Sequence, residues 1–277
     1  MNESIIKQIE LELRIEKIQI ENTLKLLQDG NTIPFIARYR KEMTRNLDEE
    51  QIRSISEYYE YQVNLLKRKE DVIRLIEEKG LITDELKQNI MNCNKLIEVE
   101  DLYRPFKEKK KTKATDAINA GLEPLAKIIM SFPKSITNIE QFFNDKIKSK
   151  EEALMGAKYI IAEWISDNAN YRKWIRNYIY NNGTIVSKIK KNAIDEEKVY
   201  SMYYEYSENI KQIKPHRVLA LNRGEKENII SVTIDVDNDT IINFIENRLV
   251  KDKESECYIY VHDSIDDSVK RLIFPSI

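Results

Sequence analysis

The stretch from Asp48 to Lys79 constrains the fold most, because it contains no glycine or proline. Apolar residues recur along it at helical spacing, Asp48 can cap a first turn, and Gly80 follows where a helix would end. At 1.5 Å per residue, such a helix would extend roughly 48 Å. The chain has only six glycines and six prolines among 277 residues, which favours long helices over a turn-rich β architecture. We predict a mainly α fold, a multi-helix bundle organised on this helix.

Further helices are predicted on both sides of the long one, from apolar residues at helical spacing and from capping residues. Ser149, with Glu152 three residues later, predicts a capping box that opens a helix. A partner helix over 167–181 ends at a tight turn, so the two resemble a helix-turn-helix unit. The other predicted helical units cover residues 4–29, 83–94, 95–103, 114–131, 240–250 and 264–273.

A small β element is predicted near the C-terminus. The strings IISVTIDVD at 229–237 and CYIYVH at 257–262 are rich in β-branched and aromatic residues, which indicates a short strand pair around an intervening helix.

We expect four segments along the chain. They are an N-terminal helical bundle over 1–104 that contains the long helix 48–79, a basic connection with helices over 105–148, a helical cluster with the helix-turn-helix-like unit over 149–228, and a small α/β segment over 229–277 that leads to further domains.

Charge is distributed unevenly along the chain, although the formal net charge is only -2. Residues 101–228 carry 24 basic and 17 acidic side chains, whereas residues 1–100 carry 16 and 20, and residues 229–277 carry 5 and 10. A polyanion would therefore be attracted to the middle of the chain. A second interpretation stays open, in which abundant Lys, Asn and Ile reflect a biased genome.

The cellular setting is predicted from what the sequence lacks. No apolar run approaches the roughly 18 to 20 residues that cross a bilayer, and no apolar signal segment stands at the start. Cys93 and Cys257 are far apart, so a disulfide framework is not expected. We expect a cytoplasmic protein that does not bind a membrane.

Signatures of catalysis are missing from the sequence. There is no phosphate-binding GxxxxGK[ST] or GxGxxG loop and no HExxH zinc motif, and His216 and His262 are far apart. Core packing is the favoured interpretation of both cysteines. The string DVDND at 235–239 lacks the glycine that an EF-hand needs, so we interpret it as an acidic surface turn. We therefore expect no enzyme activity, no metal site and no cofactor.

Three long and idiosyncratic strings stand out: IPFIARYRKEMT at 33–44, EDLYRPFKEKKKTKATDAINAGLEPLA at 100–126, and YSENIKQIKPHRVLALNRGEKE at 206–227. Together with the helix from Asp48 to Gly80, they closely resemble the amino-terminal region of the Tex family of bacterial transcription accessory proteins, in wording and in order. The resemblance covers nearly the whole chain.

The resemblance implies a larger parent protein. In the family, this region precedes an RNase-H-like domain, a helix-hairpin-helix unit and a carboxy-terminal OB-fold module that binds RNA, so the chain is expected to be a piece of a longer protein. The family also resembles a eukaryotic transcription elongation factor that works with RNA polymerase and histones. A role in transcription is therefore expected by analogy.

Two basic segments are the candidate nucleic-acid contacts. Arg38, Arg40 and Lys41 flank Tyr39, a combination that can bind phosphates while the ring stacks on a base. The favoured alternative is that the arginines form internal salt bridges with Glu42, Asp48, Glu49 or acids of the long helix. The second segment, KEKKKTK, contains no apolar residue and is expected to face solvent, either as a polyanion contact or as a loop without a partner. Its lysines are Lys107, Lys109, Lys110, Lys111 and Lys113.

Two further clusters have structural interpretations. Arg217, Arg223 and Lys226 alternate with acids around Gly224, which we interpret as a structural turn with interdomain salt bridges. Tyrosines at 200, 203, 204 and 206 could stack on bases, but packing in a helical core or interface is favoured.

The sequence therefore predicts a non-enzymatic scaffold for a transcription accessory protein, with weak and nonspecific contact to RNA or DNA through its basic segments. The rival prediction is a protein-binding module whose partner is RNA polymerase, another domain of the parent chain, or a second copy.

Overall fold

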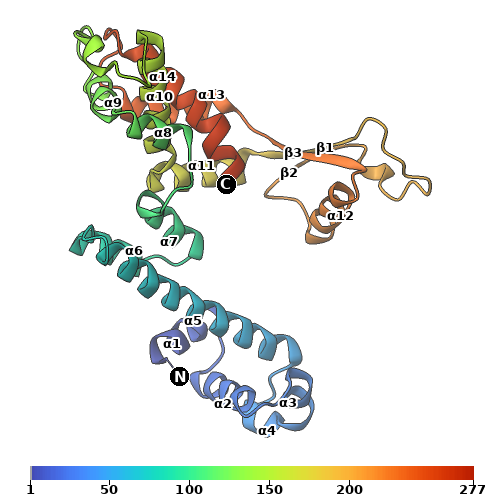
Figure 1. Ribbon diagram of the computed structural model, residues 1–277. Helices are drawn as coiled ribbons and strands as arrows, with labels where there is room; N and C mark the ends of the chain where they lie inside the picture. Colours follow the sequence, from blue (N-terminus) through green and yellow to red (C-terminus); the bar gives the residue numbers. More distant parts are fainter. Residues whose placement is uncertain (1) are drawn as a thin grey trace. The chain divides into compact units, whose positions relative to one another are not determined.

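A computed structural model describes residues 2–277 and confirms the mainly α fold. The chain forms two compact units, Met1–Tyr103 and Arg104–Ile277. The first unit is helical, and the second combines helices with one three-stranded sheet (Figure 1). Within residues 2–277, no helix has both the length and the apolar character needed to cross a membrane.

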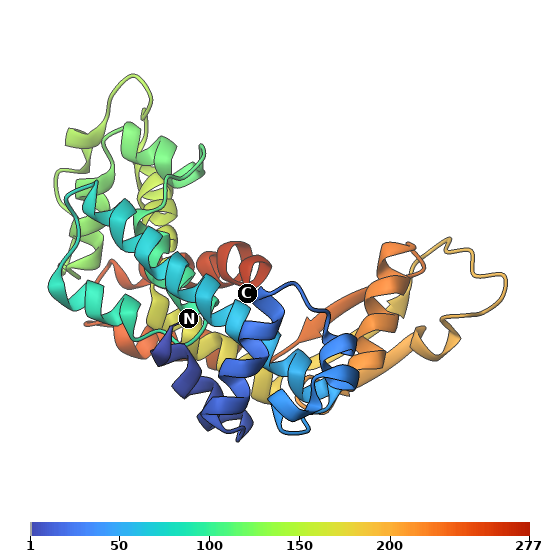
Figure 2. The same ribbon diagram turned by 90° about the horizontal axis from the view of Figure 1, so that it is seen from below.

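The long helix of the first unit is confirmed as α5 (Glu49–Glu77), about 44 Å at 1.5 Å per residue. It begins at a capping box, in which Asp48 accepts a hydrogen bond from the Gln51 backbone at 2.8 Å and the Gln51 side chain accepts one from the Asp48 backbone at 3.0 Å. The other helices of this unit pack along α5 or against one another (Figures 1 and 2). They are α1 (Glu3–Leu13), α2 (Lys17–Gln28), α3 (Ile33–Tyr39), α4 (Lys41–Thr44), α6 (Asp84–Met91) and α7 (Leu96–Tyr103).

The helical unit predicted over 4–29 is two helices rather than one. Arg14 has a left-handed backbone with φ of 54°, which ends α1 and redirects the chain into α2. Ile9 and Ile20 are fully buried on the two sides of this break. The apolar spacing continues through the break because both helices face the same core.

The helices of the second unit are arranged around α10 (Lys150–Ser166), which packs against its neighbours through small and branched residues. Ser149 caps α10 by accepting a hydrogen bond from the Glu152 backbone at 3.2 Å, as predicted. The predicted capping box is not complete, because the Glu152 side chain accepts its hydrogen bond from the Lys148 backbone rather than from Ser149. The range 114–131 is split into two helices at Gly121, which has φ of 84°. The helices that pack against α10 are α8 (Lys113–Asn119), α9 (Glu123–Met130), α11 (Ala169–Asn182) and α14 (Tyr258–Asp267), which a π-helical turn over Ser268–Ile273 extends. Helix α13 (Asn238–Leu249) packs against α14.

The sheet has the order β2-β1-β3, with both pairs antiparallel. Its strands are β1 (Thr184–Ile189), β2 (Glu205–Asn209) and β3 (Ile230–Asp235), so a strand within 229–237 is confirmed. Ser187 of β1 pairs with Tyr206 of β2 and with Val232 of β3. The sheet therefore joins residues from both sides of the boundary predicted at 228. Helix α12 (Pro215–Lys226) packs on β3 (Figure 1).

The strand predicted over 257–262 is wrong, because this string lies at the start of α14. Cys257, Val261 and Ile265 stand four residues apart and are all fully buried, which is the period of a helix. Ser264, predicted to start a final helix, lies inside α14 and donates its hydroxyl hydrogen bond to the Tyr260 carbonyl at 2.7 Å.

The turn predicted around Gly224 is also wrong, because Gly224 lies within α12. A Cβ at this position would be 2.9 Å from Cδ1 of Tyr200 and 3.0 Å from Ile230, so glycine lets the helix approach β3 closely. Tyr200 forms a small buried core with Leu221 and Ile230, and the other three tyrosines pack against it. This agrees with the favoured interpretation of core packing, except that the tyrosines come from a 3₁₀ turn and its ends and from β2 rather than from an α-helix. Tyr200 donates to Glu227 at 2.7 Å and Tyr204 donates to Asp195 at 2.8 Å.

The close packing of α10 gives a test of the core. A Cβ at Gly156 would lie 2.2 Å from Cδ1 of Leu122, a fully buried residue, and 3.3 Å from the Cβ of Ala117. Gly156→Ala is therefore expected to lower the free energy of unfolding by about 1–3 kcal/mol, despite the better helix propensity of alanine. The measurement is urea unfolding followed by tryptophan fluorescence, since both tryptophans lie in the second unit. The matched control is Met155→Ala at an exposed position of the same helix. A Gly156→Ala protein as stable as the wild type would contradict the packing.

Candidate nucleic-acid interface

The first candidate patch lies where α3 ends and α4 begins. Arg38 and Tyr39 form the last turn of α3, Arg40 is the junction residue, and Lys41 begins α4. Tyr39 is 62% exposed, and Arg38 and Lys41 are also exposed. The Arg40 guanidinium lies 5.2 Å from the centre of the Phe35 ring, a cation–π contact that orients it. The structure thus places the three cations and the exposed ring together, as the sequence predicted.

The internal salt bridges expected for these arginines do not form. Asp48 is occupied in capping α5, and Glu49 pairs with Arg53 of the same helix at 3.0 Å. Within residues 2–277, Arg38, Arg40 and Lys41 form no ion pair with an acidic side chain. Their charges are therefore available to a ligand. We call Arg38, Tyr39, Arg40 and Lys41 the α3 patch.

The second candidate, the lysine segment, spans residues 107–113. It follows a 3₁₀ turn over Arg104–Phe106 and ends where Lys113 begins α8. Thr112 caps that helix by accepting a hydrogen bond from the Thr115 backbone at 3.1 Å. The segment therefore connects two fixed helical ends and is short enough to follow the surface closely.

The prediction that all five lysines face solvent is wrong for Lys109. Its side chain is only 24% exposed and pairs with two acids near the end of α10, at 3.3 Å from Glu163 and closer still to Asp167. Arg104 donates a second charged hydrogen bond to Asp167 at 3.2 Å. Nothing in the sequence indicates this cluster, because Asp167 is 58 residues from Lys109 along the chain.

The other four lysines are exposed, as predicted. Lys107 and Lys110 form no ion pair within the described part of the chain, residues 2–277. Lys111 is 3.9 Å from Asp116, but both side chains are exposed, so this pair contributes little. Lys113 lies 4.7 Å from the centre of the Tyr159 ring and remains on the surface. Four positive charges therefore face outward from a segment that Lys109 anchors.

A fifth cation lies near Lys113. Arg271 approaches the same Tyr159 ring, with its guanidinium 5.3 Å from the ring centre. The hydrogen bond to Asp267 raises the pKa of Arg271, and the nearby negative charge adds to this effect. Arg271 therefore keeps its charge under all ordinary conditions.

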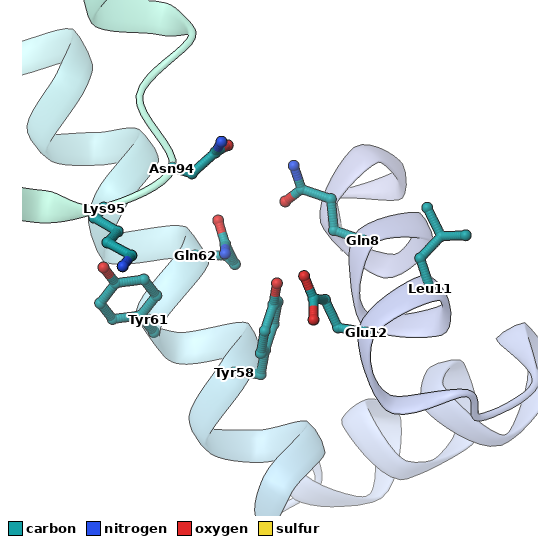
Figure 3. A pocket seen from close by; sticks show the side chains of 8 residues that line it. All are labelled: Gln8, Leu11, Glu12, Tyr58, Tyr61, Gln62, Asn94 and Lys95. Carbon is teal, nitrogen blue, oxygen red and sulfur yellow. The ribbon is translucent and has the colours of Figure 1, made fainter. Parts of the chain in front are cut away.

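A hollow in the first unit, shown in Figure 3, differs from the two basic candidates in the charge of its lining. It has a volume of about 500 Å³ and lies between α1, α5 and the loop before α7 in the first unit. Glu12 and Tyr58 point toward one another across it, and Leu11 at its edge is 72% exposed. Burial raises the pKa of the Tyr58 hydroxyl, so it stays neutral. With a carboxylate and only one lysine, Lys95, in its lining, the hollow is a poor site for phosphates.

Among residues 2–277, no three His, Cys, Asp or Glu side chains are grouped to hold a metal ion. Cys93 and Cys257 are buried in separate units, in agreement with core packing. The acidic string at 235–239 leads from the last residue of β3 into α13, where Asp237 is the cap and accepts a hydrogen bond from the Asp239 backbone at 3.0 Å. The hydrogen bond that the Thr240 hydroxyl donates to Asp237 is the largest cause of a lowered pKa of this carboxyl, and hydrogen bonds from the backbone of Thr240 and Asp239 lower the pKa further.

Comparison with known proteins agrees with the resemblance, and two of the three sequence strings, at 33–44 and 206–227, lie within the ranges that match family models. Residues 3–77 match the family described as the Tex-like protein N-terminal domain, and residues 133–265 match the Tex central region-like family. The chain belongs to the Tex family. This finding confirms the resemblance on which the expectation of a transcription role is based.

Relatives occur in bacteria and in mammals. The chain is 48% identical over 277 residues to the uncharacterized protein YdcI of Bacillus subtilis, covering 98% of this chain and 38% of that protein. It is 34% identical over 233 residues to the transcriptional accessory protein Tex of Neisseria gonorrhoeae, covering 83% of this chain and 31% of that protein. It is 28% identical over 290 residues to the human S1 RNA-binding domain-containing protein 1, covering 99% of this chain and 29% of that protein. The chain therefore spans about a third of the length of these relatives.

The anchoring role of Lys109 can be tested by substitution. Lys109→Met keeps the length of the side chain and removes the charge, which leaves Glu163 and Asp167 with fewer partners. We expect the free energy of unfolding to fall by roughly 1–3 kcal/mol, measured by urea unfolding and tryptophan fluorescence. Lys110→Met is the matched control and is expected to change stability by no more than about 0.5 kcal/mol. Equal effects of the two substitutions would show that Lys109 is not an anchor.

Proposed function

We propose that this region is a scaffold of a Tex-type transcription accessory protein that contacts RNA through its exposed cations and catalyses no reaction itself. The observation that supports this most is the lysine segment, in which Lys109 is anchored while Lys107, Lys110, Lys111 and Lys113 stay exposed. The α3 patch adds three cations without acidic partners and an exposed ring.

The physical basis is counterion release. Each phosphate that a lysine or arginine neutralises releases condensed cations from the nucleic acid, which favours binding without regard to sequence. An anchored loop has fewer conformations to lose on binding than a free one, so its lysines contribute more of their attraction to affinity. The expected contact is therefore weak, sensitive to salt and independent of base sequence.

The names of the relatives support the choice of RNA and the transcription apparatus as partners. One is named a transcriptional accessory protein and another an S1 RNA-binding domain-containing protein, so RNA and the transcription apparatus are the partners we propose here. In the whole protein, we propose that most RNA affinity comes from an OB-fold module outside this region. We also propose that the protein works in the cytoplasm.

Helices α10 and α11 resemble a helix-turn-helix, since only Asp167 and Asn168 join them. Tyr171 and Ile175 of α11 are buried in the core, and Trp174 of the same helix stacks on Phe244. We therefore propose that this pair is structural, with duplex DNA a secondary ligand at most.

A second candidate function is protein docking, and one observation favours it. The hollow of Figure 3 carries the exposed Leu11 beside polar side chains, a combination suited to a protein surface rather than to phosphate. RNA polymerase or another part of the parent protein is the partner proposed under this alternative. Such binding would depend little on salt.

The two functions are distinguished by fluorescence anisotropy with short single-stranded RNA and with duplex DNA at two salt concentrations. A variant with Lys107, Lys110, Lys111 and Lys113 changed to Gln keeps the Lys109 anchor. For RNA, the slope of log K against log salt is expected to become less steep by about 0.7 for each phosphate that the variant no longer neutralises.

The matched control changes four exposed lysines elsewhere in the second unit, Lys188, Lys191, Lys198 and Lys214, to Gln. It removes the same net charge and is expected to leave the salt slope nearly unchanged. Absence of RNA binding at low salt would contradict the proposal and favour protein docking.

The α3 patch is tested separately by the double variant Arg38→Gln, Lys41→Gln. Neither side chain has an internal partner among residues 2–277, so stability should be retained while the salt slope for RNA becomes less steep by about 1.4. Lys25→Gln, Lys87→Gln, two exposed positions in the first unit, is the control of equal charge. An unchanged slope in the patch variant would exclude the α3 patch from the RNA contact.

A further inference from the structure

The two tryptophans of this chain have different environments. Trp174 is part of the core of the second unit, with its ring 3.6 Å from that of Phe244 and nearly parallel to it. Trp164, near the end of α10, is 36% exposed and does not belong to that core. A large aromatic ring that the fold leaves exposed is available to a ligand.

A cavity of about 560 Å³ lies beside Trp164. Its volume falls in the range of small-molecule binding sites. Pro105 and the half-exposed Ile118 contribute apolar surface to the lining, and Thr115 and Asn168 contribute polar atoms. Lys107, which has no ion pair within residues 2–277, also lines it. The cavity therefore combines a flat aromatic ring, apolar surface and an available cation.

The acids in the cavity do not leave it negatively charged. Asp167 and Glu163 are matched by Arg104 and Lys109, two acids against two cations. Glu163 also accepts a hydrogen bond from the Thr112 hydroxyl at 3.3 Å. The lining itself holds two lysines and two acids, and Arg104, which pairs with Asp167 from outside the lining, adds a third cation. Lys107 is thus the lining cation that neither acid pairs, and the exposed Lys110 adds a further cation in the same segment.

We propose that this cavity accepts one unpaired base of single-stranded RNA, which stacks on the indole of Trp164 while a neighbouring phosphate pairs with Lys107. This inference rests on the proposed function, since it names the site at which the RNA contact becomes specific for single strands. A base presents a flat apolar face to the ring, and its backbone carries the charge that the lysine neutralises. A paired base in a duplex offers no free face, so the cavity selects single strands. The site acts together with the lysine segment, which supplies attraction without base contacts.

The test uses Trp164 as the reporter. Trp174→Phe leaves Trp164 as the only tryptophan, and phenylalanine can keep the stack on Phe244. Circular dichroism verifies that this variant is folded. Its fluorescence is titrated with a short single-stranded RNA, with the same RNA as a duplex, and with an abasic phosphodiester of equal length and charge. The proposal predicts quenching by the single strand, and much less by the duplex or the abasic chain.

Anisotropy measured on the same samples separates the base site from the general RNA contact. Binding of the single-stranded RNA without quenching of Trp164 would overturn the base site and leave the proposed RNA contact intact. No binding of any oligonucleotide at low salt would overturn both. Equal quenching by the abasic chain would also overturn the base site, since no base would be needed.

Substitution provides a second and independent measurement. Trp164→Ala is expected to weaken binding of single-stranded RNA roughly 5- to 100-fold and to leave binding of the abasic chain unchanged, because only stacking is removed. Trp164→Phe is the matched control and should retain part of the affinity. Equal weakening for RNA and for the abasic chain would contradict stacking.

Discussion

The Asp167 carboxylate determines how the basic middle of this chain is presented. Its side chain is only 10% exposed and accepts charged hydrogen bonds from Arg104, which begins the 3₁₀ turn, and from Lys109, which follows that turn. A buried carboxylate needs such partners, because desolvation without them is costly. The segment from 104 to 109 is therefore attached to the junction of α10 and α11. Lys110, Lys111 and Lys113 follow this segment. They have no buried acidic partner such as Asp167 and remain at the surface.

This attachment places charge and aromatic surface together. Trp164 lies in the last turn of α10, three residues before the cap residue Asp167. The ion pairs that fix the lysine segment therefore also place this segment beside the exposed indole of Trp164. The α3 patch shows the same combination of cations and an exposed ring in the other unit, where Asp48 and Glu49 are engaged within α5. In both places, several nearby acids already have other partners, which leaves neighbouring cations available. RNA is the ligand that we propose for these cations.

Local patterns predict most of the fold. The cap at Asp48 and the glycine at 80 predict α5, because helix ends depend on neighbouring residues. The composition of CYIYVH suits either a strand or a helix, and only the burial of Cys257, Val261 and Ile265 at a spacing of four shows the helix. The predicted turn around Gly224 is wrong for a related reason. That glycine reflects contact with Tyr200 and Ile230, which no local pattern contains.

The candidate site is only partly predictable. The segment's lack of apolar residues correctly places Lys107, Lys110, Lys111 and Lys113 at the surface. The role of Lys109 depends on acids more than fifty residues away, which one sequence does not reveal. In the sequence, Trp164 is one member of a helix pattern, and its exposure follows from which face of α10 meets α8, α9 and α14.

In the proposed mode of binding, RNA contacts the second unit at the lysine segment and the adjacent end of α10. Hydrogen–deuterium exchange of the chain, with and without single-stranded RNA, locates the contact most directly. Peptides that cover 104–113 and 160–168 are expected to exchange more slowly when RNA is bound, with no change over the sheet. Slower exchange confined to the sheet and α12, or none in either unit while RNA is bound, would contradict this mode of binding.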